Sequence, residues 1–269
     1  MSDEMNETKH GDTILLSRDG GIATLMLNRP AVRNAFNDAM IDAVNATFDQ
    51  LGQDESVRVI VMAATGPAFS TGADLGWMKR MADFTDAENL ADAMRLAGML
   101  RTIYRCPKPV IAKVQGDCYG GGVGLVAASD IVVAAESVHF CLSEVKLGLI
   151  PATIAPYIIR ALGEQAARRY FLTAERFSAS EAHRLGFVHD VTSADALEAT
   201  VAAMSKALTV AGPRALAEAK RLIRDIAGQP LTDALVADTA ERIAQCRASD
   251  EGREGMRAFF EKRAPSWKV

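Results

Sequence analysis

Short apolar runs alternate with amphipathic segments through the first part of the chain. Two of these runs flank Asp19-Gly20-Gly21, which is a strong signal for a β-hairpin. The runs that predict strands cover residues 14–17, 22–27, 57–63, 110–114, 131–134 and 139–142. Between them, apolar residues recur at helical spacing, which predicts amphipathic helices. This alternation predicts right-handed βαβ crossovers and a sheet with several parallel strands.

Two of the predicted helices have recognisable ends. Asn37 is suited to cap a helix that carries apolar residues at helical spacing, namely Met40, Ile41, Val44, Phe48 and Leu51. A second helix covers residues 86–105 and ends before Pro107 and Pro109. Between the two lie residues 65–81, which are too irregular and too rich in Gly, Pro and Ser to predict either a helix or a strand. A loop of this length inside a compact domain is usually functional.

The pattern becomes almost entirely helical after Pro151, with residues 188–191 as the one further strand that we expect. The predicted helices cover residues 156–162, 164–172, 180–185, 194–210, 213–227, 231–247 and 251–262. We therefore expect a loose N-terminal tail over residues 1–12 and an α/β core with the active site over residues 13–192. Residues 193–269 are expected to form a helical region that mediates oligomerisation.

Composition narrows the class of protein. The chain has 269 residues, 49% of them hydrophobic, which is ample for a folded core. A net charge of −4 and a pI near 5.7 argue against a nucleic-acid-binding surface. The four cysteines have no metal-binding spacing, so we expect free thiols, no bound metal and no disulfide bonds. With no signal peptide and no apolar run long enough to cross a bilayer, a cytoplasmic location and no membrane partner are expected.

A glycine cluster at Gly120, Gly121 and Gly122 lies between the apolar run 110–114 and a segment of small apolar residues that predicts a helix over 121–128. Glycine lets the backbone turn sharply and come close to a ligand, because it has no Cβ. The first N–H groups of a helix have no partner within the helix and lie at the positive end of its dipole. This helix start is therefore suited to an anion, or to an oxygen that becomes negative during a reaction.

Three interpretations of the cluster remain open at this point. Gly122, Gly124 and Ala127 satisfy the dinucleotide fingerprint, and Glu144 lies about twenty residues further on, where that fingerprint has an acidic residue. However, residues 115–119 separate the first glycine from the end of the strand, which is unlike a Rossmann unit. The second candidate ligand is the carbonyl of a thioester, whose oxygen becomes negative when its α-carbon becomes nucleophilic. The third interpretation is a tight turn that only lets a helix pack on a strand.

The irregular loop favours the thioester. Residues 68–78 read Ala-Phe-Ser-Thr-Gly-Ala-Asp-Leu-Gly-Trp-Met, and residues 143–151 read Ser-Glu-Val-Lys-Leu-Gly-Leu-Ile-Pro. Together with the glycine cluster, in this order and at these intervals, they resemble the crotonase superfamily, also called the enoyl-CoA hydratase/isomerase family. The resemblance extends from Leu27-Asn28-Arg29-Pro30 to the segment 251–263. It implies a crotonase-like ββα spiral core with a helical C-terminal trimerisation region.

The resemblance also implies roles for individual residues. The two backbone N–H groups of the family's oxyanion hole fall on Ala73 and Gly121, and backbone donors of this kind are fixed before the substrate arrives. Glu144 matches the second of two catalytic glutamates that hydratases of this family place over Cα and Cβ of the substrate. The first glutamate is replaced by Gly124, and a single glutamate is the pattern of Δ3,Δ2-enoyl-CoA isomerases. Activity as an isomerase is therefore the nearest alternative to activity as a hydratase.

One branch of the family resembles the chain more closely. Residues 119–126, 142–157 and 166–177 resemble bacterial hydratases of glutaconyl-type thioesters, such as 3-methylglutaconyl-CoA or isohexenylglutaconyl-CoA. These substrates carry an additional carboxylate. We expect that this carboxylate, or a water molecule in the space left by Gly124, does part of the work of the absent glutamate. An NAD-dependent oxidoreductase and an RNA-binding protein are alternatives of other classes, and the acidic balance argues against the second.

The resemblance implies that coenzyme A is part of the substrate and that no separate cofactor is needed. It also implies further residues that bind the substrate. Arg29 and Arg33 are candidates for contacts to its adenine and phosphates, while Phe259 and Lys262 match positions that reach the coenzyme A of a neighbouring subunit. The remaining substrate-binding candidates are Ala73, Asp74, Leu75, Gly76, Gly121 and Gly124. Gly76 replaces a lysine that is frequent in the family, so one phosphate contact is expected to be missing. A homotrimer or a dimer of trimers is expected.

Overall fold

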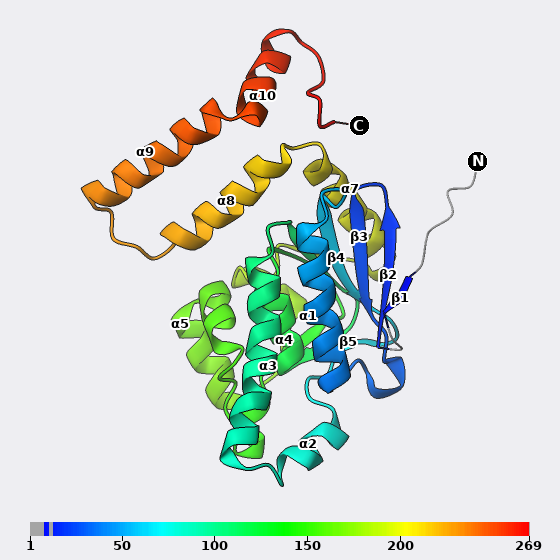
Figure 1. Cartoon of the computed structure of the whole chain (residues 1–269). Helices are drawn as coiled ribbons and strands as arrows, with labels where there is room; N and C mark the ends of the chain where they lie inside the picture. The colour runs from blue at the N-terminus through cyan, green and yellow to red at the C-terminus, as the bar shows by residue number, and fades with distance from the viewer. Residues whose placement is uncertain (1–7, 11–12, 269) are drawn as a thin grey trace, which may run out of the picture.

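Two sheets form the centre of the protein, whose computed structural model describes residues 8–10 and 13–268 (Figure 1). Within these residues, the larger sheet has seven strands in the order β1, β2, β3, β4, β6, β8 and β11. Their bounds are β1 (Thr8–His10), β2 (Ile14–Asp19), β3 (Ile22–Leu27), β4 (Val59–Ala64), β6 (Val110–Val114), β8 (Ile131–Ala135) and β11 (Asp190–Thr192). The strands from β3 to β11 are parallel, as predicted. Both faces of β4 are buried, which is typical of a parallel strand covered by helices.

The smaller sheet has the order β10, β9, β7 and β5. Its strands are β5 (Ala68–Ser70), β7 (Asp117–Tyr119), β9 (His139–Cys141) and β10 (Phe177–Ser178). Each of β5, β7 and β9 directly follows a strand of the larger sheet, and helical structure comes next, so the chain winds as a repeated ββα unit. This repeat confirms the α/β spiral core that the family resemblance implies.

The loop over residues 65–81 is more regular than predicted. It contains β5 and then α2 (Leu75–Met81). The strand has three residues, too few for a periodic signal, and the helix begins at a side-chain cap provided by Asp74. The N-terminal range is also corrected, because Thr8–His10 pairs with β2 as β1 and is not a loose tail. Residues 1–7 and 11–12 of that range lie outside the described residues.

Helices α1 (Asp38–Gln53), α3 (Asp86–Arg105) and α5 (Ala155–Thr173) surround α4 (Gly121–Ala128) in Figure 1. Asn37 caps α1 as predicted, since its side chain accepts a hydrogen bond from the Met40 N–H. Gly163 interrupts α5 with a non-helical conformation, which agrees with the two separate helices that the sequence predicts there. Helix α4 packs against both α3 and α5, and six of its eight residues are buried. The glycine turn therefore leads into the centre of the protein.

The chain after β11 is helical. It comprises α7 (Leu197–Thr209), α8 (Pro213–Ile226), α9 (Asp233–Ala248) and α10 (Asp250–Phe260). Helix α7 packs on β4, β6 and β8, whereas α8, α9 and α10 extend away from the sheets in Figure 1. An ion pair of 2.7 Å between Lys220 and Asp130 attaches α8 to the core. Hydrogen bonds from Arg58 to the carbonyl oxygens of Ala211 and Trp267 attach the ends of this region.

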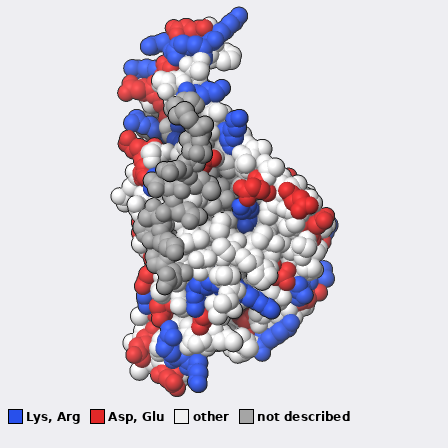
Figure 2. Space-filling model, turned by 90° about the vertical axis from the view of Figure 1, so that its right-hand side faces the viewer, with Lys and Arg blue, Asp and Glu red and all other residues white. Residues whose placement is uncertain are grey.

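The surface carries charges of both signs. On the face shown in Figure 2, Lys and Arg side chains are interspersed with Asp and Glu around a broad uncharged area. Across the described part of the chain, the helices include none that is long and apolar enough to cross a membrane.

Candidate active site

The backbone segments that contain Ala73 and Gly121 lie against each other. A Cβ placed on Gly72 would be 3.5 Å from the Gly121 nitrogen and 3.0 Å from the Tyr119 carbonyl oxygen. Gly72 has a φ of +83°, a conformation that favours glycine. The absence of a side chain at this position lets the loop after β5 approach the start of α4. The structure thus brings together the two segments that the sequence assigns to an oxyanion hole.

Both candidate amides are unengaged among the described residues. Ala73 forms a parallel bridge with Phe36, in which Phe36 N–H donates to the Gly72 carbonyl and Asp74 N–H donates to the Phe36 carbonyl. Because alternate groups of an extended segment face opposite ways, the Ala73 N–H points away from Phe36. Gly121 is the first residue of α4, so its N–H has no acceptor within the helix. Two donors therefore remain available beside one another.

Phe36 also fixes the position of Gly121. A Cβ on Gly121 would lie 2.7 Å from Cε2 of Phe36, which is closer than real Cβ contacts allow. The same aromatic residue therefore anchors the Ala73 segment through its backbone and contacts Gly121 through its ring. A side chain at position 121 would move one of the two amides.

Glu144 lies over the glycine turn. It begins the short 3-10 helix η2 (Glu144–Leu147), and its Oε1 would be 3.0 Å from a Cβ on Gly120. Gly120 has a φ of +49° and donates its N–H to the Cys141 carbonyl at 2.9 Å, which holds the turn against the end of β9. Oε2 of Glu144 is buried and accepts no hydrogen bond from the described residues. The carboxylate is thus in contact with the turn that presents Gly121.

Burial raises the pKa of Glu144 above the ordinary value of a glutamate, and a hydrogen bond from its own backbone N–H only partly opposes this shift. A carboxyl group whose charged form is disfavoured is a stronger base once it is ionised. The position and the raised pKa of Glu144 therefore suit a residue that takes and returns a proton.

Gly124 does not border an open space. A Cβ at this position would lie 2.2 Å from Cγ2 of Ile154 and 3.6 Å from Cδ2 of Leu100. The expectation that the absence of the first glutamate leaves room for a water molecule is therefore wrong, because Ile154 occupies this volume. Gly124 is also corrected as a substrate contact, since it packs inside the core. The sequence around Ile154 carries no signal for this contact.

The dinucleotide interpretation of the glycines is corrected for the same reason. A Cβ on Gly122 would lie 2.5 Å from the Ser70 carbonyl oxygen, so this glycine allows α4 to pack on β5. Gly124 similarly allows packing against Ile154. Neither glycine of the fingerprint is available for a pyrophosphate.

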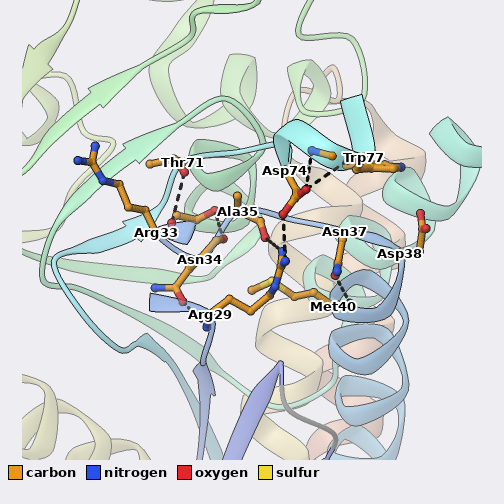
Figure 3. Close-up of polar contacts among 12 residues, drawn as sticks. Arg29, Arg33, Asn34, Ala35, Asn37, Asp38, Met40, Thr71, Asp74 and Trp77 are labelled. Carbon is orange, nitrogen blue, oxygen red and sulfur yellow. Dashed lines mark hydrogen bonds and ion pairs between the residues drawn. The ribbon is translucent and has the colours of Figure 1, made fainter. Parts of the chain in front are cut away.

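Asp74, Leu75 and Gly76 form the start of α2. The Asp74 carboxylate accepts hydrogen bonds from the backbone N–H groups of Gly76 at 2.8 Å and Trp77 at 3.2 Å. It also pairs with Arg29, whose guanidinium donates to the Ala35 carbonyl as well (Figure 3). Leu75 is 82% exposed and can contact a substrate. The Arg29 guanidinium therefore has partners within the protein, and its contact with coenzyme A stays a prediction.

Arg33 is placed differently from Arg29. Its side chain points away from the Arg29 cluster in Figure 3 and has no hydrogen bond or ion pair to the described residues. It borders a cavity of about 550 Å³ together with Thr71, Tyr119 and Ser143, each of which is close in sequence to a candidate site residue. Of the two arginines that the sequence selects, Arg33 is the one available to an anionic part of the substrate.

Phe259 and Lys262 are not brought to the other site residues within one chain. Phe259 lies on α10 and is 78% exposed, and Lys262 follows the end of that helix. Figure 1 shows α10 at the opposite end of the molecule from α2. Their contact with the coenzyme A of a neighbouring subunit stays a prediction. Over the described residues, no cluster of three or more His, Cys, Asp or Glu side chains is arranged to hold a metal ion.

Comparison with known proteins shows the family of the chain. Residues 17–269 match the protein family described as "Enoyl-CoA hydratase/isomerase". The match covers most of the chain, and the chain belongs to this family. It is therefore an enzyme of the enoyl-CoA hydratase class, in a family that also includes isomerases.

Individual relatives cover nearly the same length. A putative enoyl-CoA hydratase of Thermus thermophilus is 34% identical over 246 residues, which are 91% of this chain and 97% of the relative. The 2,3-dehydroadipyl-CoA hydratase of Escherichia coli is 31% identical over 257 residues, with coverage of 95% and 98%. The crystal structure of an enoyl-CoA hydratase from Shewanella pealeana is 42% identical and superposes with a TM-score of 0.92, covering 95% of this chain and 96% of that one.

Proposed function

We propose that this enzyme adds water to a glutaconyl-type α,β-unsaturated acyl-CoA, such as 3-methylglutaconyl-CoA. The observation that carries the proposal is the contact between the half-buried Glu144 carboxylate, whose Oε2 is enclosed, and the turn at Gly120, next to the unengaged amides of Ala73 and Gly121. A carbonyl oxygen that accepts from these amides would have its α-carbon near that carboxylate. This is the arrangement that addition across a conjugated thioester requires.

The proposed reaction needs one base that also acts as an acid. Glu144 takes a proton from water while the water oxygen bonds to Cβ, and the electrons of the double bond move to the carbonyl oxygen. The amides of Ala73 and Gly121 stabilise this enolate oxygen. The enolate then collapses, Cα takes the proton from Glu144, and the carboxylate is restored. The product carries a hydroxyl group on Cβ and a hydrogen on Cα.

The glutaconyl-type substrate is supported by the sequence segments around the glycine turn and Glu144, and by the contact between Gly124 and Ile154. Since Ile154 occupies the position beside Gly124, a second protein carboxylate is absent there and a water molecule does not fit. The additional carboxylate of the substrate would then help to orient the attacking water. One relative is named for an acyl-CoA of adipic acid, which also has a second carboxylate.

A direct comparison of two thioesters tests this substrate class. Hydration is followed by the loss of the conjugated enoyl absorbance, with crotonyl-CoA and 3-methylglutaconyl-CoA at equal concentrations. We expect a higher kcat/KM for the carboxylated substrate. Equal rates for both would show that the substrate carboxylate takes no part in the reaction.

The second candidate is an isomerase that moves a double bond between the 3 and 2 positions by means of Glu144. The observation in its favour is the same replacement of a second carboxylate by Gly124 and Ile154. Incubation with a 3-enoyl-CoA would create the conjugated absorbance if the enzyme is an isomerase, whereas a hydratase removes this absorbance from a 2-enoyl-CoA. Failure to consume either thioester would contradict both candidates.

A homotrimer, or a dimer of trimers, is part of the proposal. Helices α8 and α10 and the loop after α8 expose large apolar side chains: Ile223 at 67%, Leu231 at 86%, Phe259 at 78% and Phe260 at 77%. Apolar groups at this density are typical of a surface that another subunit covers. Light scattering coupled to size-exclusion chromatography would give the mass, and a monomer at micromolar concentration would contradict this part of the proposal.

A further inference from the structure

Arg29 lies within the protein and contacts two segments at once. It follows β3, and its Nη2 lies 2.9 Å from Oδ2 of Asp74, while Nη1 donates to the Ala35 carbonyl oxygen (Figure 3). The side chains of Arg29 and Asp74 are only 20% and 16% exposed. A guanidinium group is planar and presents several donors in a fixed geometry, so it can hold two acceptors in a defined relative position.

Both contacts of Arg29 are adjacent to the bridge that orients Ala73. Ala35 precedes Phe36, and Asp74 follows Ala73. The Phe36 N–H donates to the Gly72 carbonyl at 2.6 Å, and the Phe36 carbonyl accepts from the Asp74 N–H at 2.8 Å. The guanidinium therefore connects the two segments that meet in this bridge, from the Ala35 carbonyl oxygen to the Asp74 carboxylate. Loss of this connection would leave the two backbone hydrogen bonds of Phe36 as the contacts that directly flank Ala73.

Asp74 has a second role that depends on the same orientation. Its other oxygen caps α2 through the N–H groups of Gly76 and Trp77. Burial by itself would raise the pKa of Asp74, but the hydrogen bonds from Arg29 and from these two amides outweigh it and lower the pKa. The carboxylate is thus held in its ionised form, which the ion pair with Arg29 requires.

We propose that Arg29 is a positioning residue for the oxyanion donor Ala73, and not a ligand of coenzyme A. The inference rests on the proposed function, because it assumes that the Ala73 N–H binds the thioester carbonyl. It assigns the phosphate contact, if one of the two arginines makes it, to Arg33. Loss of a positioning residue should lower kcat, whereas loss of a residue that binds coenzyme A should raise KM for the acyl-CoA.

Two thioesters of the same acyl group separate the roles. One is the acyl-CoA, and the other is the N-acetylcysteamine thioester, which lacks the adenosine and the phosphates. We expect Arg29→Ala to lower kcat by about 10-fold to 100-fold on both thioesters, because displacing a reacting group or an oxyanion donor by about 1 Å has effects of this order. The ratio of the two KM values stays unchanged. Arg29→Lys keeps the charge but not the planar fork, so its kcat is expected to be intermediate.

Two control variants are available in the chain. Arg18 pairs with Asp54 at 2.7 Å and is also partly buried, but it belongs to β2 and has no contact with the site, so Arg18→Ala should leave kcat unchanged. Arg33→Ala should raise KM for the acyl-CoA and not for the shorter thioester. An Arg29→Ala variant with unchanged kcat, or with a higher KM for the acyl-CoA alone, would overturn the proposal.

A second variant and a spectroscopic measurement keep the test decisive. If Arg29→Ala does not fold, Asp74→Asn removes the ion pair while its amide oxygen can still cap α2, and it should lower kcat on both thioesters. The carbonyl stretching frequency of a bound saturated acyl-CoA labelled with ¹³C should be lowered by the wild type and less so by Arg29→Lys. Equal frequencies for the two proteins would overturn the role of Arg29 even without turnover. Absence of turnover by the wild type on every enoyl thioester would instead contradict the proposed function.

Discussion

Ile154 occupies the volume into which a side chain at Gly124 would extend: a Cβ on Gly124 would lie 2.2 Å from Cγ2 and 2.9 Å from Cβ of Ile154. Ile154 is 1% exposed and is packed in the core directly before α5. Where the family resemblance implies a catalytic carboxylate, the chain thus has a glycine covered by an apolar residue. In the proposed mechanism, the chemistry therefore relies on Glu144 and on groups that the substrate supplies.

Gly124→Ala should destabilise the protein by about 1–3 kcal/mol, because an additional methyl group overpacks the core at Ile154. Urea unfolding of the variant measures this change. The double variant Gly124→Ala/Ile154→Ala should recover part of it. Gly98 is a matched control, since it also lies in a helix but has no atom within 4 Å of its Cβ position. Gly98→Ala should be neutral or stabilising by up to about 1 kcal/mol, and equal effects at both positions would contradict the contact.

Glu144→Gln should lower kcat by about 10²-fold to 10⁴-fold, the usual contribution of a general acid or base. The glutamine keeps the size of the side chain but cannot accept a proton from water. Binding of a saturated acyl-CoA, measured by calorimetry, should change little. The exposed Glu136 provides the control, and Glu136→Gln should leave kcat unaffected. A fully active Glu144→Gln enzyme would exclude the proposed mechanism.

The pH dependence of kcat/KM should fall on the acidic side with a midpoint above 4.5, the ordinary pKa of a glutamate, because burial raises the pKa of Glu144. The ionised form is the active base, so activity is lost as the pH decreases through the raised pKa. This midpoint is measured by recording kcat/KM as a function of pH with whichever of crotonyl-CoA and 3-methylglutaconyl-CoA reacts faster. A midpoint at or below 4.5 would show that another group controls the activity.

The same shift predicts the effect of pH on stability. A carboxyl group with a raised pKa binds a proton more readily in the folded than in the unfolded state, so its contribution to stability decreases as the pH rises from the unfolded to the folded pKa. Glu144→Gln removes this dependence. The free energy of unfolding of this variant, relative to the wild type, should therefore increase over that pH window. Parallel curves for the two proteins would contradict a buried carboxylate.

Gly121→Ala should lower kcat by about 10²-fold, since the methyl group would meet the Phe36 ring and displace the amide by a fraction of an ångström to about 1 Å. We expect kcat to decrease both for the acyl-CoA and for the N-acetylcysteamine thioester. Circular dichroism would check that the fold is kept. Restoration of activity by Phe36→Leu in the same chain would support the contact, and a Gly121→Ala enzyme with wild-type kcat would contradict it.

The sequence predicts the features that depend on local pattern. Apolar runs such as residues 110–114 predict the parallel strands, and Asn37 and Gly163 mark helix boundaries that the structure confirms. The glycine cluster and the family resemblance together point to Glu144 and to the turn as the centre of the site, and the structure places Glu144 against the turn. The sequence does not predict the three-residue strands β5 and β7, because a periodic signal needs a longer segment.

The features of the site that the sequence does not predict are contacts between residues that are distant in the sequence. Gly124 and Ile154 are thirty residues apart in the sequence, and Arg29 and Asp74 are separated by 45. No spacing rule connects such pairs, because they are neighbours only in the tertiary structure. For Arg29, the position beside the predicted ligand site indicates a ligand contact, whereas its partner in the structure is a carboxylate of the same chain.

Gly120 both turns the chain into α4 and lies against Glu144, so in the proposed mechanism this one turn sets the distance between the Gly121 amide that binds the thioester oxygen and the carboxylate beside the α-carbon. The apolar residues Leu75 and Ile150 are exposed to 82% and 74%. They follow Ala73 and Glu144, respectively, in the sequence. Substitutions of such exposed residues would leave the turn at Gly120 and its contact with Glu144 unchanged. Changes at these positions could thus adapt the enzyme to acyl groups of different length and polarity, while the arrangement of Glu144 and the two amides stays the same.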